Sequence, residues 1–187
     1  MKAIRAWGPF LLCVWLLAFG SAGAASAGTV RVQAGESIAE ALASAKPGTV
    51  IEVEPGVYHE ALTVDTPRIT LRGVVQGDQR PVLDGRGQLG DGVIASGSPF
   101  VMSGFQVQHY VGNGVTTQGV DGVVLTDLII DDTGLYGLYP VQSANIEVTH
   151  NTVTGIRDAG IYVGESNSAL VAFNAVSYTH LTLPTKA

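Results

Sequence analysis

Two tyrosines at equivalent repeat positions are the residues of this 187-residue chain whose type and spacing point most directly to a ligand. Tyr139 and Tyr162 are 23 residues apart, and each follows a glycine and an aliphatic residue. If both point outward from neighbouring strands about 4.8 Å apart, their rings form a platform for the C–H faces of a sugar. The alternative is an aromatic ladder that only stiffens the fold, because outward aromatic pairs also stabilise sheets.

Charged residues that precede these tyrosine strands extend the candidate site. Asp131 and Asp132 are expected in the turn before Tyr139, and Arg157 and Asp158 in the turn before Tyr162. Carboxylates accept hydrogen bonds from hydroxyls, and a guanidinium pairs with a carboxylate such as that of a uronate. The candidate substrate-binding set is therefore Tyr139, Tyr162, Arg157, Asp158, Asp131 and Asp132.

Calcium is the alternative ligand for the Asp131-Asp132 pair, because it is a hard cation that takes oxygen ligands. The equivalent positions one repeat later are Thr154 and Gly155, which add no carboxylate. No metal site or cofactor is therefore assigned. The dipeptides Asp84-Gly85 and Asp121-Gly122 are interpreted as turns.

Three histidines and two asparagines complete the polar candidates. His59, His109 and His150 do not share a position in the repeat, so each is interpreted as a lone surface or strand histidine. Asn151 and Asn174 are 23 residues apart and predict an internal asparagine ladder at a bend. The chain contains no G-x-S-x-G, H-E-x-x-H or Walker sequence, and catalytic residues stay unassigned.

The repeat itself indicates the elements that position these residues. Gly92, Gly114, Gly137 and Gly160 each open a Gly-aliphatic segment, at spacings of 22, 23 and 23 residues. This period suits a coil of three short strands and three turns, in which stacked turns supply the core. The residues after these glycines, which are Val93, Val115, Leu138 and Ile161, should form one inward column. The sequence predicts an all-β fold, a single-stranded parallel β-helix with about 23 residues per rung.

A short helix over residues 37–46 is expected to cover the open end of the first rung. Ser37 is a candidate N-cap and Glu40 stands three residues later, as in a capping box. The residues Ile38, Ala41, Leu42 and Ala45 fall on one helical face. Pro47-Gly48 should end the helix, and residues 50–58 read as strand, turn and strand.

The first 27 residues have the pattern of a secretory signal peptide. Lys2 and Arg5 precede an apolar run, and Ala25-Ser26-Ala27 fits the cleavage rule. Removal of residues 1–27 takes away Cys13, the single cysteine, and leaves 8 basic and 16 acidic residues, a formal charge of −8. Nucleic acid and anionic membrane are therefore not expected as partners. We expect an exported protein, periplasmic or extracellular.

The β-helix domain is expected to span residues 28–176. Residues 177–187 lack the glycine of the repeat, because Leu183 stands near the expected position. This segment resembles translated sequencing-adapter bases, so it is interpreted as a non-native tail. The alternative is a natural irregular tail. In the first interpretation the natural protein continues with further rungs.

The chain resembles secreted β-helix repeat proteins of the pectate-lyase-like superfamily. The resemblance rests on the opening from Ser37 to Gly73 and on the rungs over residues 137–176, and it implies a right-handed coil. That superfamily contains polysaccharide lyases, uronan epimerases, copper-enzyme maturation factors and proteins without known activity. Where the epimerases carry an Asp-Pro-His-Asp or Asp-Pro-His-Glu run, this chain reads Tyr139-Pro140-Val141-Gln142.

The resemblance and the aromatic pair together suggest two functions. One is an exported β-helix protein that binds or processes polysaccharide, including acidic polysaccharide, with lyase-like or epimerase-like chemistry if it is an enzyme. The other is a non-catalytic envelope scaffold, or a periplasmic maturation partner of another envelope protein. The fold alone does not decide between them.

Overall fold

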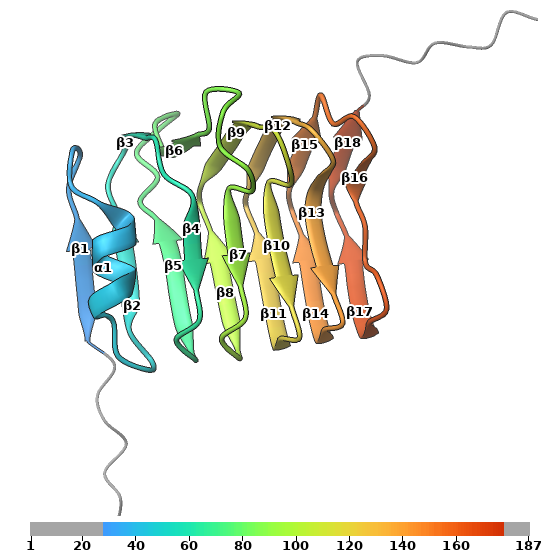
Figure 1. The fold of residues 1–187 in the computed structure, drawn as a ribbon, viewed down its shortest axis with the longest axis horizontal. Helices are drawn as coiled ribbons and strands as arrows, with labels where there is room; N and C mark the ends of the chain where they lie inside the picture. Colours follow the sequence, from blue (N-terminus) through green and yellow to red (C-terminus); the bar gives the residue numbers. More distant parts are fainter. Residues whose placement is uncertain (1–27, 178–187) are drawn as a thin grey trace, which may run out of the picture.

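Three parallel β-sheets form the walls of a right-handed β-solenoid in the computed structural model, which describes residues 28–177 (Figure 1). Each turn of about 23 residues passes through sheets A, B and C in that order. Sheet A contains β1 (Thr29–Val32), β2 (Val50–Val53), β5 (Ile69–Gly73), β8 (Phe100–Ser103), β11 (Asp121–Thr126), β14 (Ala144–Thr149) and β17 (Asn167–Ala172). Sheet B contains β3 (Gly56–Tyr58), β6 (Pro81–Asp84), β9 (Gln106–Tyr110), β12 (Ile129–Thr133), β15 (Thr152–Thr154) and β18 (Ala175–Ser177). Sheet C contains β4 (Leu62–Val64), β7 (Val93–Ala95), β10 (Val115–Gln118), β13 (Tyr136–Val141) and β16 (Ala159–Ile161).

The predicted inward column is confirmed in sheet C. Val93 pairs with Val115, Val115 with Leu138, and Leu138 with Ile161. The first three are fully buried and Ile161 packs against the same core. Leu62 of β4 extends the column by one turn at the N-terminal end. Burial of this apolar stack is the main stabilising contribution of the fold.

Steric crowding between turns explains the glycine repeat. A Cβ atom at Gly92 would lie 2.6 Å from the carbonyl oxygen of Gly114, and one at Gly114 would lie 2.6 Å from that of Gly137. A Cβ at Gly137 would lie 2.5 Å from the oxygen of Gly160. Side chains are excluded here because successive turns approach backbone to backbone. The spacing that revealed the period is thus a packing requirement.

Helix α1 (Ile38–Ser44) agrees with the expected helix to within two residues. Ser37 is the N-cap and its hydroxyl accepts the backbone N–H of Glu40. Ile38 and Leu42 are buried, as the helical face predicted. The helix contacts β1, β2 and β4. It therefore covers the first turn on the side where β4, the first strand of sheet C, lies. β1 remains the terminal strand of sheet A, so the expected shielding of backbone edges does not extend to it.

The acidic side chain that binds backbone N–H groups at the start of α1 is Glu60, and not the Glu40 of the predicted capping box. Its carboxylate accepts the backbone N–H groups of Ile38 at 3.3 Å and Ala39 at 2.8 Å. The Ser37 hydroxyl also donates to it at 3.4 Å. A carboxylate at a helix N-terminus satisfies free N–H groups and interacts favourably with the helix dipole. The helix is therefore tied to the segment that leads into sheet C.

The asparagine ladder is confirmed at the bend between sheets A and B. Asn151 is 1% exposed, accepts the N–H of Leu128 and donates to the carbonyl of Leu125. Asn174 repeats the arrangement one turn later, because it accepts the N–H of Asn151 and donates to the carbonyl of Val148. Each amide satisfies backbone groups that the bend would otherwise leave unpaired.

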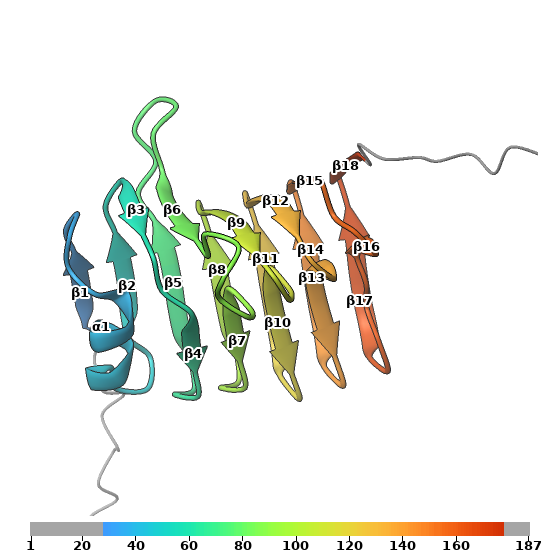
Figure 2. The ribbon, with the colours of Figure 1, turned by 45° about the horizontal axis from the view of Figure 1, so that its top comes forward.

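Two long loops interrupt an otherwise regular coil. The described turns from sheet A to sheet B contain two residues each, except for the seven-residue loop 74–80 before β6. The turn that follows β6 is also extended and comprises the eight residues 85–92. In Figure 2 the loop before β6 rises above the neighbouring turns. Strand β6 is therefore flanked by long loops at both ends.

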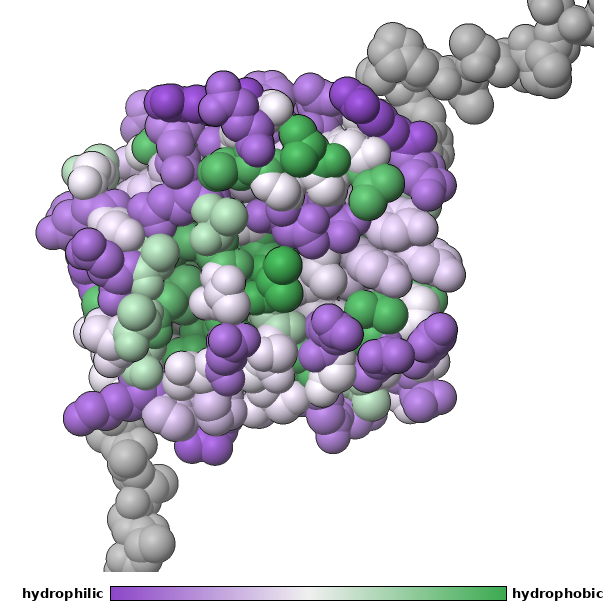
Figure 3. Space-filling view, in the orientation of Figure 1, coloured by the Kyte–Doolittle hydropathy of each residue, from purple (hydrophilic) through white to green (hydrophobic). Residues whose placement is uncertain are grey.

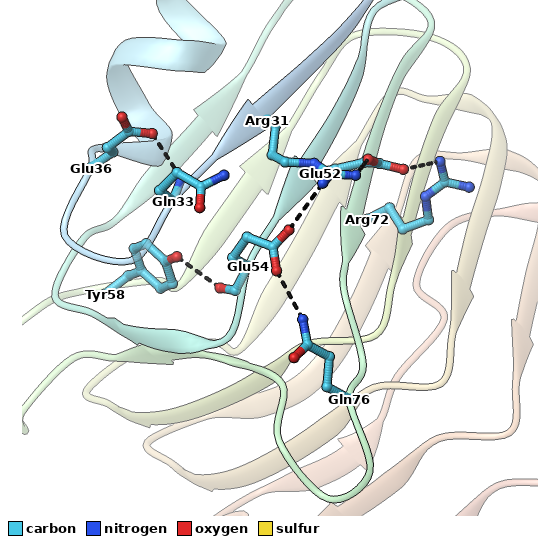
Figure 4. A network of polar contacts seen from close by, with 8 residues as sticks. All are labelled: Arg31, Gln33, Glu36, Glu52, Glu54, Tyr58, Arg72 and Gln76. Carbon is cyan, nitrogen blue, oxygen red and sulfur yellow. Dashed lines mark hydrogen bonds and ion pairs between the residues drawn. The ribbon is translucent and has the colours of Figure 1, made fainter.

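The outer face of sheet A carries an exposed ionic ladder at its N-terminal end (Figure 4). Glu52 pairs with Arg31 at 2.9 Å and with Arg72 at 2.5 Å. Glu54 also lies 3.6 Å from Arg31 and accepts a hydrogen bond from Gln76 at 3.1 Å. Exposed ion pairs of this kind contribute little to stability. The Gln76 hydrogen bond connects the loop 74–80 to the turn that follows β2.

The expected signal peptide, residues 1–27, lies outside the described residues, and so does the expected tail 177–187 except for Ser177, which ends β18. Residues 28–177 include no helix with the combined length and apolarity that crossing a membrane requires. The face in Figure 3 shows separate hydrophobic patches among hydrophilic residues.

Candidate functional site

Tyr139 and Tyr162 lie side by side on the outer face of sheet C, as the repeat predicted. Leu138 is in register with Ile161, which places the two tyrosines on adjacent turns. Their ring centroids are 5.5 Å apart and the ring planes differ by 12°. Tyr162 is 45% exposed, and Tyr139 is half-buried. Both side chains are therefore accessible at the surface.

Tyr136 is a third member of this cluster and was not predicted. Its ring centroid lies 4.7 Å from that of Tyr139 and 5.0 Å from that of Tyr162. Strict alternation along β13 would point Tyr136 inward, yet Gly137 and Leu138 are both buried and the alternation is broken there. Because Gly137 has no side chain, the backbone can sit close to the core while Tyr136 turns outward. We call Tyr136, Tyr139 and Tyr162 the tyrosine cluster.

The rings of the cluster pack against one another. Tyr139 and Tyr162 are stacked, so the faces that they turn toward each other are covered. This part of the arrangement is the aromatic ladder that the sequence left open as the alternative. The accessible surface is the remaining part of Tyr162 together with the ring edges. The expected platform of two outward rings is thus a compact cluster of three rings.

Tyr136 has an acidic neighbour. Partial burial, followed by the nearby charge of Asp158, raises the pKa of Tyr136 above its ordinary value. A phenol of ordinary pKa is already protonated at neutral pH, and the raised pKa makes Tyr136 less suited still to act as a base. Asp158 is exposed, and its backbone N–H bonds to the carbonyl of Leu135. The structure therefore places Asp158 next to the tyrosine cluster.

A buried polar network fixes the backbone beside Tyr136. Asp91 accepts the backbone N–H of Asn113 at 2.9 Å, the amide of the same residue at 3.0 Å and the Thr116 hydroxyl at 3.0 Å. The side-chain oxygen Oδ1 of Asn113 accepts the backbone N–H of Tyr136 at 3.1 Å. Asn113 and Thr116 are 9% and 7% exposed. The tyrosine cluster thus stands on a rigid support, which favours a defined surface.

The other charged candidates divide between two sheets. Arg157 is exposed in the turn before β16, next in sequence to Asp158. Asp131 and Asp132 belong to strand β12 of sheet B, so their expected place in a turn is wrong. Asp131 is in register with Gln108 and Thr154 and accepts the Thr154 hydroxyl at 2.7 Å. The structure therefore brings Asp158 to the tyrosines, whereas Asp131 and Asp132 lie on another sheet.

Two of the histidines contact the same residue, Asp84, one at its carboxylate and the other at its backbone carbonyl, so neither is a lone residue as interpreted from the sequence. His109 Nδ1 lies 3.0 Å from Asp84 Oδ1, and His59 Nδ1 lies 3.0 Å from the Asp84 carbonyl oxygen. In sheet B, Tyr58 pairs with Leu83 and Leu83 with Val107, at spacings of 25 and 24 residues, so counting at the regular period of 23 did not align these histidines. The ring of His150 stacks on Phe173, with centroids 5.2 Å apart.

In the described part of the chain, no group of side chains is arranged to bind a metal ion. Among residues 28–177, no three or more His, Cys, Asp or Glu side chains are grouped to hold a metal ion. Calcium at Asp131 and Asp132 therefore stays a prediction, and it would require further oxygen ligands.

Comparison with known proteins gives a family and a fold. The structure is similar to that of an alginate lyase from Paenibacillus sp. str. FPU-7, with a TM-score of 0.65 and 17% sequence identity. The match covers 81% of this chain and 58% of the lyase chain, so this chain spans less than two thirds of that enzyme. No curated protein matches the sequence. The family model described as the right handed beta helix region matches residues 84–179, which is about half of the chain, and the chain belongs to that family.

Proposed function

We propose that this protein is an exported β-helix protein that binds polysaccharide through the tyrosine cluster. The observation that carries the proposal is the outward grouping of Tyr136, Tyr139 and Tyr162 within 5.5 Å of one another on sheet C. Tyrosine rings offer apolar faces to a sugar ring and hydroxyls to its polar groups. The likeness of the fold to an alginate lyase supports a polysaccharide as ligand in a coarse way.

An acidic polysaccharide is the finer form of this proposal. Arg157 is exposed in the turn that also carries Asp158, and its guanidinium can form a paired contact with a uronate carboxylate. Asp158 would accept hydrogen bonds from sugar hydroxyls. Processing of the bound chain, by lyase-like or epimerase-like chemistry, would need a proton-transfer group beside the cluster. The raised pKa of Tyr136 does not favour Tyr136 as that base.

Substitution of the two repeat tyrosines tests the proposal. Tyr139→Ala and Tyr162→Ala should each weaken glycan binding by about 1 kcal/mol or more, in line with aromatic contact energies. Binding would be screened on a glycan array and measured by isothermal titration calorimetry. Ile94→Ala is the matched control, because Ile94 is 40% exposed on the same sheet, two turns before Tyr139. Wild-type affinity in both tyrosine variants would rule out the cluster as the binding surface.

Arg157→Ala tests the acidic form separately. The variant should bind alginate and oligogalacturonate more weakly, while its affinity for uncharged oligosaccharides stays unchanged, because only the carboxylate partner is lost. Arg157→Lys keeps the charge and should retain part of the affinity. Equal losses for charged and uncharged ligands would contradict a carboxylate contact.

A non-catalytic envelope scaffold is the second candidate. The observation in its favour is the mutual stacking of Tyr139 and Tyr162, which is the geometry of a structural ladder. In that case the tyrosine variants lose stability in thermal unfolding, and the wild type binds no glycan on the array. The partner would then be another envelope protein.

A further inference from the structure

We infer that the outer face of sheet B carries a second binding site, a groove for an uncharged saccharide beneath the loop 74–80. The groove has a volume of about 380 Å³ and lies between this loop and the strands β3, β6 and β9. That volume falls at the lower end of the range of small-molecule sites. The site lies on a different sheet from the tyrosine cluster.

The loop that forms the wall of this groove is attached to the coil at two points and hydrogen-bonded within itself. Gln76 donates to Glu54 at 3.1 Å (Figure 4). Its backbone also forms paired hydrogen bonds with that of Gln79. At the far end of the loop, Arg80 Nη1 donates to the Asp127 carbonyl oxygen at 3.0 Å and lies 3.4 Å from the Asp127 carboxylate. Asp127 belongs to the coil two turns farther on. The groove is therefore formed before a ligand arrives, which lowers the entropic cost of binding.

The lining of the groove combines an apolar floor with a polar rim. Val57 and Val82 are in register on neighbouring strands and provide the floor. Gln106 is in register with Val82 on the next strand, and Asp78 and Arg80 descend from the loop. A sugar ring has a matching distribution of apolar and polar groups, because its two faces carry C–H bonds and its edge carries hydroxyls.

A hydrogen-bond chain fixes which atoms Gln106 presents. The ionised Asp84 carboxylate is an acceptor only, so at 3.4 Å it receives the Gln108 amide N–H. The oxygen of Gln108 then accepts the Gln106 amide N–H at 2.6 Å. Gln106 Oε1 is left as an acceptor at the groove. Arg80 commits only Nη1 among the contacts described in residues 28–177, so its other N–H groups can donate.

The charges around the groove favour an uncharged ligand over a uronate. Arg80 already faces Asp127, and Asp78 on the rim adds negative charge. An anionic sugar would meet the Asp78 carboxylate, and Arg80, the one basic residue in the lining, is already paired with Asp127. Hydroxyl groups both donate and accept, so they match a rim with Arg80 as donor and Gln106 and Asp78 as acceptors.

Binding of neutral oligosaccharides to the full chain, with Tyr139→Ala and Tyr162→Ala combined, isolates this groove from the tyrosine cluster. The probes are cello-, malto- and galacto-oligosaccharides, with oligogalacturonate as the charged comparison. We expect at least one neutral probe to shift the side-chain amide NMR signals of Gln106 and Gln108. Adding Gln106→Ala should then weaken that binding at least fivefold. Thr152→Ala is the control, because Thr152 occupies the same outward row two turns beyond Gln106.

Three results would overturn the inference: no neutral probe shifts these signals, Gln106→Ala binds as tightly as its parent, or oligogalacturonate binds the groove more tightly than the neutral probes. Thermal unfolding of each variant confirms that the fold is kept. The tyrosine variants alone decide the proposed function, so either proposal can fail while the other stands.

Discussion

Asp84 is the last residue of β6, and several neighbouring groups determine the pKa of its carboxyl group. Burial acts to raise the pKa of Asp84, but the Arg86 backbone N–H and the side chains of His109 and Gln108 outweigh it. The pKa of Asp84 therefore lies below its ordinary value. A depressed carboxyl pKa means that the ionised form stabilises the folded state.

Stability should accordingly depend on Asp84 in acid. Its contribution is present above the unfolded-state pKa of about 4 and is lost as the pH falls through the lower folded-state pKa. Asp84→Asn should flatten the fall of unfolding free energy over that range, which urea denaturation at a series of pH values would measure. Asp78→Asn, at an exposed loop position, is the control. Parallel pH profiles for Asp84→Asn and the wild type would contradict this role.

At the residue scale, the sequence predicted the side chains that obey the strict period and missed the one that departs from it. Tyr139, Tyr162, Asn151 and Asn174 repeat at 23 residues, and their arrangement was foreseen. Tyr136 was missed because Gly137 breaks the in-and-out alternation. The expectation that side chains alternate inward and outward along a strand cannot reveal such a break. The aromatic residue three positions before Tyr139 was nevertheless visible in the sequence.

At the scale of the element, α1 depends on a residue distant in sequence. A helix of seven residues is too short to be stable alone, so its ends and its buried face must be supported by the coil. Ile38 and Leu42 supply the buried face. Glu60 supplies the N-terminal acceptor from the turn before β4. Sequence reasoning assigned this acid to Glu40, because a capping box is recognised from local spacing alone.

Glu60→Ala should therefore destabilise the protein by about 1 kcal/mol, in line with other losses of helix caps. Glu40→Ala should change stability by no more than about 0.5 kcal/mol, as exposed substitutions usually do. Chemical denaturation followed by circular dichroism would give both values. A larger loss in Glu40→Ala than in Glu60→Ala would show that the local capping box is the dominant contact.

The same contrast between regular and irregular elements explains the limits of the fold prediction. From Gly92 onward, the turns keep to 22 or 23 residues, and strands and inward positions could be assigned by counting. The loops 74–80 and 85–92 lengthen the coil around β6. Counting could therefore not align His59, Asp84 and His109, and the groove on sheet B was hidden for the same reason.

At the scale of the whole molecule, the solenoid is a stack in which each turn covers the core of the one before. Val148 and Val153 are fully buried because Val171 and Val176 lie over them in the next turn. In that last described turn, Val171 is 46% exposed and Val176 is 39% exposed, beside the shallow hollow that also includes Phe173. β17 is the terminal strand of sheet A among the described residues.

An apolar face next to a terminal strand is a template for association between chains. We therefore expect the purified protein to self-associate through this end, with a weight-average mass in light scattering that rises with concentration. Val171→Lys should reduce the association, because a charge at this position opposes both apolar contact and strand pairing. Val111→Lys is the matched control, since Val111 is 53% exposed in the turn between β9 and β10, away from this end. A monomeric wild type at high concentration, or equal effects of the two lysine variants, would show that this end does not mediate self-association.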